Sequence, residues 1–131
     1  MDPQRRRASA VERVGDILVI SLWDREYISW SGDEPEVFQT EVIDFVVAQP
    51  GPVWLVLDYT KKTYLSSRHV GKLAVLNNTL RNKGSAMRLC SLGPQLLEVL
   101  RIVDPKASIF KTTATRAEAI SELQALQALN T

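Results

Sequence analysis

Five consecutive apolar residues, Val53 to Leu57, follow Pro50-Gly51-Pro52 and precede Asp58. A run of this length with proline and glycine before it is too short for a helix and is typical of a strand. Because strand side chains alternate between the two faces of a sheet, an unbroken apolar run needs cover on both faces. The run therefore predicts a central strand within a helix-covered sheet, with Trp54 and Leu55 facing opposite sides.

The rest of the chain alternates between strand-like and helix-like patterns. The predicted strands are 11–14, 17–23, 87–92 and 108–112, and the predicted helices are 35–48, 67–82, 94–103 and 115 onward. Short strand–helix–strand connections favour parallel neighbours, whereas the two-residue turn Gly15-Asp16 indicates an antiparallel hairpin. We therefore predict an α/β fold with a single mixed β-sheet of about five strands packed with four helices, in the order ββαβαβαβα. Residues 1–10 are interpreted as a flexible tail, and residues 11–131 as one domain.

Two helix ends carry clear local signals. Lys83-Gly84 follows the second predicted helix, and glycine is the usual residue just beyond a helix end. Thr115 and Glu118 have the spacing of a capping box at the start of the last helix. Both signals support the predicted boundaries.

Length, charge and cysteine content restrict the class of protein. The chain has 131 residues, 45% hydrophobic and 24% charged, as expected for one globular domain. A net charge of +1 gives no electrostatic preference for nucleic acid or acidic lipid. The single cysteine, Cys90, lies in an apolar run, which predicts a buried, inert thiol. Arg5 to Arg7 are not followed by the apolar part of a signal peptide, and no membrane-span candidate occurs, so we expect a cytoplasmic protein.

Residues that enzymes use for catalysis and metal binding are sparse. Neither glycine-rich phosphate-binding motif occurs, and one histidine with one cysteine cannot form a metal cluster. Ser67, His69 and Asp58 form a triad only on paper, because side chains at i and i+2 of a helix point in different directions. Aromatic residues do not alternate with basic ones as on nucleic-acid-binding surfaces. We therefore predict a protein that is not an enzyme, without cofactor or metal, and expect His69 to be exposed.

Two serines precede the helix predicted after the central strand. A serine at the N-cap accepts a hydrogen bond from a first-turn N–H group, so Ser66 or Ser67 should begin this helix. The position is partly exposed, and the positive end of the helix dipole tolerates a bound or covalent phosphate. From the residues alone, the pair is either a cap and nothing more or a cap beside a phosphate-accepting site.

Three patterns, in their order along the chain, resemble the STAS domain, and in particular the stand-alone anti-sigma factor antagonists of bacteria. The first runs from Leu57-Asp58-Tyr59 through Tyr64-Leu65-Ser66-Ser67 to Gly71. The second is the long helix ending at Arg81-Asn82-Lys83-Gly84, followed by Met87 to Cys90. The third is Ser91-Leu92-Gly93-Pro94 with the helix behind it. The similarity covers nearly the whole chain.

In that family, the second position of this helix start is the serine that a partner anti-sigma kinase phosphorylates. The resemblance places this role on Ser67, with Ser66 where an aspartate is frequent and Arg68-His69 where a small residue and glycine are usual. It implies that the unphosphorylated protein sequesters an anti-sigma factor kinase, a histidine-kinase-like ATPase, and that phosphorylation releases it. The bulky Arg68-His69 pair favours an alternative: a scaffold or regulator that is never phosphorylated and binds other STAS proteins.

The predicted partner-binding residues cluster around the helix start, with one exception. They are Ser66, Ser67, Arg68, His69, Lys72 and, from another segment, Asp24. Asp24 begins a long polar stretch that ends at Asp33, and loops on a rigid scaffold often carry recognition. That stretch either contacts the partner or only connects the second strand to the next helix.

Overall fold

The computed structural model describes residues 10–22, 37–62 and 65–129. Over these residues, five strands form one sheet in the order β1-β2-β3-β4-β5. The strands are β1 (Ala10–Val14), β2 (Ile17–Ser21), β3 (Trp54–Asp58), β4 (Ala86–Cys90) and β5 (Thr112–Thr113). The β1–β2 hairpin is antiparallel, and the remaining neighbours pair in parallel. The predicted mixed sheet is therefore confirmed.

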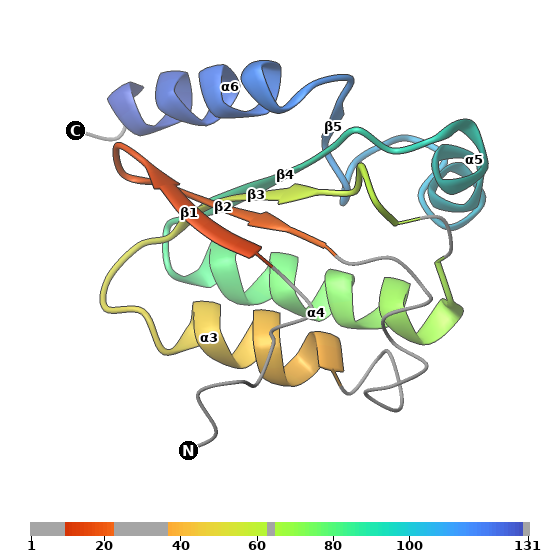
Figure 1. The fold of residues 1–131 in the computed structure, drawn as a ribbon, viewed down its shortest axis with the longest axis horizontal. Helices are drawn as coiled ribbons and strands as arrows, with labels where there is room; N and C mark the ends of the chain where they lie inside the picture. The colour runs from red at the N-terminus through yellow and green to blue at the C-terminus, as the bar shows by residue number, and fades with distance from the viewer. Residues whose placement is uncertain (1–9, 23–36, 63–64, 130–131) are drawn as a thin grey trace.

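Helices cover both faces of this sheet (Figure 1). The π-helical η1 (Gln39–Ile43) continues directly into α3 (Asp44–Val47), and α4 (Ser67–Asn82), α5 (Pro94–Val103) and α6 (Arg116–Leu129) follow. α3 and α4 lie on one face, α6 covers the other, and α5 lies at the right-hand end of the sheet in this view. With η1 and α3 taken as one continuous helix, the described residues form the four predicted helices.

The central strand is buried on both faces, as its apolar run predicted. β3 lies between β2 and β4, and all five of its residues are buried. Leu55 belongs to the core on the α3 and α4 side, whereas Trp54 packs with Ala119 and Leu123 of α6. The predicted opposite orientation of Trp54 and Leu55 is confirmed, and it follows from the alternation of side chains along a strand.

The local signals at turns and helix ends are also confirmed. Gly15 and Gly84 adopt left-handed φ angles of 61° and 74°, at the hairpin turn and at the end of α4. At α6, the Glu118 N–H donates to Thr115 Oγ1 at 3.1 Å, and the Thr115 N–H donates to Glu118 Oε1 at 3.1 Å. These two bonds form a capping box, which satisfies donors that a helix start leaves open.

The last predicted strand was wrong over most of its length. Residues 108–112 were expected to be extended, but β5 comprises only Thr112–Thr113. Three successive N–H groups, from Ser108 to Phe110, donate instead to the carboxylate of Asp104 at 3.1, 2.9 and 2.9 Å. The carboxylate of Asp104, just after α5, therefore accepts hydrogen bonds from N–H groups that would otherwise have donated to a neighbouring strand.

Other boundaries differ by smaller amounts or lie beyond the described residues. β1 begins at Ala10, which was assigned to the tail, and the flexibility of the remaining tail stays a prediction. β2 ends at Ser21, while the predicted strand end at Trp23 and the predicted helix start at Pro35 lie outside the described residues. In the part of the chain that the structure describes, no helix combines the length and apolar character needed to cross a bilayer.

Candidate functional site

The candidate site lies where α4 begins, beyond the carboxyl end of β3. Ser66 is the N-cap: its Oγ accepts from the His69 N–H at 3.0 Å, and its carbonyl accepts from the Val70 N–H at 3.1 Å. Ser67 is the first residue inside the helix and is exposed. The cap and the exposed hydroxyl are therefore two different serines.

The expectation that His69 is exposed was wrong. Its exposed fraction is 0%, and its ring lies 4.2 Å from that of Phe38, centroid to centroid. Its Nε2 is hydrogen-bonded to the hydroxyl of Tyr59 at 2.9 Å. The reason is helical register, because His69 precedes the buried Leu73 by four residues and so lies on the inward stripe of α4. His69 therefore lies beneath the first turn of α4, in contact with Tyr59 and Phe38, and its buried side chain cannot contact a partner directly.

Basic side chains lie on the outward side of the same helix turn. Arg68 is exposed, and Lys72 is half-buried, with its Nζ donating to Gln39 Oε1 at 3.0 Å. This bond ties α4 to η1. A hollow of about 300 Å³ between the two helices is lined by Gln39, Ile43, Arg68, Gly71, Lys72 and Val75. The surface beside Ser67 is thus basic, with apolar residues at its edge.

Asp58, at the end of β3, has a structural role. Its carboxylate accepts from the Thr60 N–H at 2.8 Å and from Arg116 Nε and Nη2 at 2.9 and 2.8 Å. Arg116 also donates to Ser21 Oγ at 2.7 Å and pairs with Glu12. Burial raises the pKa of Asp58, but hydrogen bonds from Thr60 and Arg116 outweigh burial and hold the pKa below its usual value. The residue joins the sheet to α6.

The side chains that a reactive site would need are therefore separated. Ser67 faces solvent, His69 points into the core and Asp58 is held by Arg116, so the three do not form a triad. Cys90 is buried as predicted, and burial with the nearby Asp58 charge raises the pKa of its thiol to about 11. A thiol with this pKa is protonated at neutral pH and is a poor nucleophile.

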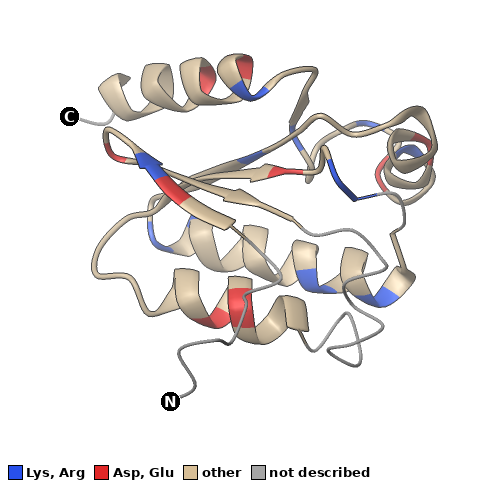
Figure 2. Ribbon diagram, viewed as in Figure 1, with Lys and Arg blue, Asp and Glu red and all other residues tan. Residues whose placement is uncertain are grey.

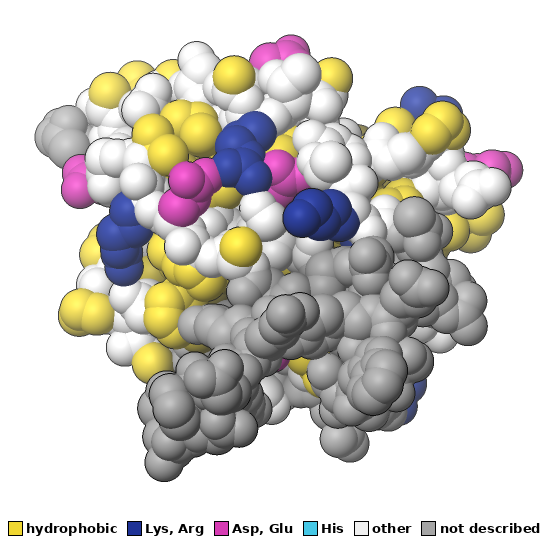
Figure 3. All heavy atoms as spheres, viewed as in Figure 1, with side chains coloured by type: hydrophobic (Ala, Val, Ile, Leu, Met, Phe, Trp, Pro, Cys, Tyr) yellow, Lys and Arg dark blue, Asp and Glu magenta, His cyan; other side chains and the backbone are white. Residues whose placement is uncertain are grey.

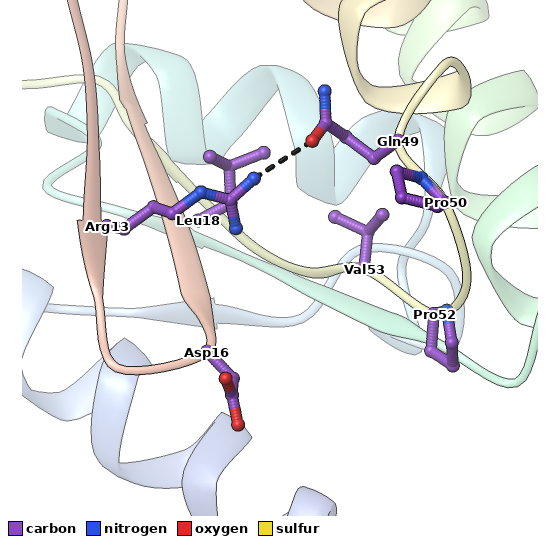
Figure 4. Close-up of a pocket in the computed structure, with 7 residues that line it drawn as sticks. All are labelled: Arg13, Asp16, Leu18, Gln49, Pro50, Pro52 and Val53. Atoms are coloured by element: carbon purple, nitrogen blue, oxygen red, sulfur yellow. Dashed lines mark hydrogen bonds between the residues drawn. The ribbon is translucent and has the colours of Figure 1, made fainter.

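Two further hollows lie elsewhere on the molecule. One, of about 470 Å³, lies past the ends of β3 and β4 and is lined by Tyr59, Thr60, Lys62, Ser91, Gly93, Pro94, Gln95 and Leu96. The other, of about 180 Å³, lies between the β1–β2 hairpin and the loop before β3 (Figure 4). There Arg13 Nη2 donates to Gln49 Oε1 at 2.9 Å, while Asp16 points away. This contact bridges the smaller hollow and connects the hairpin to the end of α3.

The structure brings together most of the predicted contact residues. Ser66, Ser67, Arg68 and Lys72 share the first turns of α4, while Asp24 lies outside the described residues. Sequence reasoning missed the apolar and amide side chains of the hollow, which are Gln39, Ile43 and Val75. No local signal pairs Gln39 with α4, because 33 residues separate it from Lys72.

No protein-family model matches the chain, and no curated protein does. Solved structures match it closely in shape. An anti-sigma-factor antagonist (STAS) domain protein from Planctomyces limnophilus superposes with a TM-score of 0.64 at 16% identity, over 94% of this chain and 98% of that one. The chain has the STAS fold.

Two other solved structures share this STAS fold. A chain from the stressosome, described as a signal integration and transduction hub, matches with a TM-score of 0.67 at 16% identity, covering 90% of this chain and 98% of that chain. The anti-sigma factor antagonist SpoIIAA in its unphosphorylated form matches with a TM-score of 0.52 at 18% identity, over 89% and 98%. The resemblance seen in the sequence therefore agrees with the three-dimensional arrangement.

Proposed function

We propose that this STAS-fold chain is a cytoplasmic anti-sigma factor antagonist that works as a phospho-switched binding protein. Unphosphorylated, it sequesters an anti-sigma kinase of the histidine-kinase-like ATPase type; phosphorylation of Ser67 releases the kinase. The observation that carries the proposal is the exposed Ser67 at the first position of α4, whose cap is supplied by Ser66. The STAS-fold neighbours named as anti-sigma factor antagonists support the same class of function.

The physical chemistry of this position suits a switch. A phosphoserine adds about −1.5 to −2 charges at neutral pH, enough to repel carboxylates on a partner surface. The helix itself tolerates the added charge, because an anion at the N-terminus interacts favourably with the helix dipole. Phosphorylation of Ser67 therefore changes the contact surface without unfolding the chain. In this scheme the chain is a substrate of the kinase and has no catalytic role.

The test compares wild type with Ser67→Asp and Ser67→Ala against a candidate anti-sigma kinase. Ser67→Asp should weaken binding at least about tenfold, which corresponds to about 1.4 kcal/mol, and Ser67→Ala should bind constitutively when ATP is present. Ser121→Asp is the matched control, because Ser121 is an exposed serine on α6, on the other face of the sheet. Mass spectrometry after incubation with kinase and ATP should locate the phosphate on Ser67 rather than on Ser66.

A second function is favoured by one specific observation. Arg68 is exposed beside Ser67, and its bulk lies where a kinase would approach the serine. Its guanidinium group can also pair with a phosphate on Ser67, which weakens the repulsion between that phosphate and carboxylates of the partner. This favours a scaffold that is never phosphorylated and binds other STAS proteins, and the stressosome neighbour supports the same alternative. If wild type and both Ser67 variants bind one partner equally, the phospho-switch is wrong and the scaffold takes its place.

A further inference from the structure

The chain between Asp58 and Glu98 contains no acidic residue, although it contains seven lysines and arginines. Two of the seven are not available at the surface of α4, because Lys62 is buried and Arg88 pairs with Glu122 of α6. The other five lie on α4 or in the segments that flank it, and they are Lys61, Arg68, Lys72, Arg81 and Lys83. Figure 2 shows blue but no red positions along α4, whereas positive and negative side chains lie next to one another on the face shown in Figure 3. The charges on α4 are therefore of one sign.

One exposed stripe runs along α4 from Ser67. At 3.6 residues per turn, Gly71, Val75, Asn78 and Arg81 follow Ser67 on the same side of the helix, and all five are exposed. From the first of them to the last, the helix rises about 21 Å. Val75 is 62% exposed, although large aliphatic side chains are usually buried. A partner that contacts Ser67 can therefore also contact the rest of this α4 stripe.

Gly71, in the middle of the stripe, has no packing role inside the chain. Glycine in the interior of a helix is destabilising relative to alanine. Its φ angle is not in the left-handed region, and a Cβ added to it would meet no other atom within 4 Å. The missing side chain instead leaves open the hollow of about 300 Å³ between η1 and α4, which Gly71 lines. A side chain from a partner can approach the backbone of α4 closely at this point.

Carboxylates of the described residues do not neutralise the basic side chains of this surface. Lys72 Nζ donates to the side-chain oxygen of Gln39, and Lys83 Nζ donates to a backbone carbonyl. The side chain of Arg81 is exposed and makes no hydrogen bond or ion pair with a described residue. On the other side of the hollow, Asp44 accepts from Gln39 Nε2 at 2.9 Å, so that Gln39 lies between Asp44 and Lys72. Carboxylates from outside the chain can therefore pair with these basic groups.

We propose that the anti-sigma kinase docks along the α4 stripe through an acidic surface and inserts a side chain into the hollow at Gly71. This inference rests on the proposed function and specifies the chemistry of its partner. Opposite charges orient the encounter, and Val75 supplies apolar area that binding removes from water. A phosphate on Ser67, at one end of the stripe, repels the same carboxylates that Lys72 and Arg81 attract. Val75 and the hollow favour a protein over a nucleic acid, whose phosphate backbone offers no apolar side chain.

Binding to the candidate anti-sigma kinase in the presence of ADP, which supplies no phosphoryl group to Ser67, tests the proposal. Wild type should bind more weakly as NaCl is raised from about 0.05 M to about 0.5 M, because salt screens charge contacts. Gly71→Gln fills the hollow and should bind at least about tenfold more weakly. Its melting temperature should stay at or above that of wild type, because glutamine favours a helix more than glycine does. Arg81→Glu should also weaken binding, whereas Arg81→Lys, which keeps the charge, should bind nearly as wild type does.

Matched controls separate this surface from general effects of bulk and charge. Ala117→Gln adds similar bulk at an exposed position of α6, and Lys106→Glu reverses an exposed charge after α5, so both should bind as wild type does. Binding that is insensitive to NaCl, or wild-type affinity in Gly71→Gln and Arg81→Glu, overturns the docking surface.

The same measurements distinguish the docking surface from the phospho-switch. If Ser67→Asp weakens binding but Gly71→Gln and Arg81→Glu do not, the switch stands without this docking surface. If Gly71→Gln and Arg81→Glu weaken binding but Ser67→Asp does not, the docking surface stands and the switch is wrong. A wild type that does not bind the kinase, whether or not it binds duplex DNA, overturns both.

Discussion

At the scale of single residues, the start of α4 shows how one step of register separates two roles. Ser66 has extended backbone angles, φ −83° and ψ 159°, which aim its hydroxyl at the first-turn N–H of His69. Ser67, one residue later, is already helical and exposed. Backbone geometry alone thus gives two identical side chains different roles: the Ser66 hydroxyl caps the helix, and the Ser67 hydroxyl is exposed.

This assignment predicts different costs for the same substitution. Ser66→Ala should lower the free energy of unfolding by about 0.5–2 kcal/mol, because it removes the cap. Ser67→Ala should change it by less than about 0.5 kcal/mol, as is usual at an exposed site. Urea denaturation of the two variants and wild type measures the difference. Equal losses for both, or a larger loss for Ser67→Ala, would contradict the assignment of the cap.

At the scale of elements, Arg116 connects the first turn of α6 to three strands. Its guanidinium group contacts Glu12 of β1, Ser21 of β2 and Asp58 of β3. Arginine suits this position because its planar group presents several donors in a fixed geometry, whereas lysine offers a single flexible ammonium group. One side chain thus aligns a helix with the edge and the centre of the sheet.

Arg116→Lys should therefore destabilise the protein by about 1–3 kcal/mol, because the buried Asp58 carboxylate loses a donor that lysine cannot replace. Arg88→Lys is the matched control. Arg88 lies on β4 and pairs at 2.7 Å with the half-exposed Glu122 of α6, the helix that also carries Arg116. Because the Glu122 carboxylate is half-exposed and can be hydrated, the loss in Arg88→Lys should be smaller, about 0.2–1 kcal/mol. Thermal unfolding of both variants tests the contrast, and equal shifts in melting temperature would count against the proposed role of Arg116.

At the scale of the whole molecule, two buried carboxylates hold segments around the sheet in place. Asp58 binds Thr60 and Arg116, and Asp104 gathers the loop that leads to β5. Hydrogen bonds from the N–H groups of Phe110, Ile109 and Ser108 outweigh burial and lower the pKa of Asp104 below its usual value. Both carboxylates are thus more acidic in the folded chain than in the unfolded one.

The sign of these shifts predicts an acid-sensitive fold. Because the folded pKa values are depressed, the stabilisation is complete above the unfolded pKa of about 3.9 and is lost as pH falls through the folded values. The melting temperature should therefore fall as pH is lowered below about 4, and Asp104→Asn should flatten this decline and lower the melting temperature at neutral pH. Asp44→Asn, at an exposed position, should follow the wild-type curve. A wild-type curve that stays flat down to pH 3 would rule out this role.

Much of the fold is determined by features that act over a few residues. The apolar run of β3 needs cover on both faces, Gly84 allows a left-handed helix end, and Thr115 with Glu118 satisfies the start of α6. Each depends on backbone sterics or on hydrogen bonds between near neighbours. The sequence by itself therefore determined the order of elements, the central strand and the serine-bearing helix start.

Contacts between distant segments decided the rest. Asp58 and Arg116 are 58 residues apart, and the direction of His69 follows from its bond to Tyr59 and its place against Phe38. Asp104 draws the segment after α5 away from strand pairing through a carboxylate that becomes buried only when α5 packs. Burial and donor supply at these sites depend on which surfaces meet in the folded chain, so only the tertiary structure could decide them.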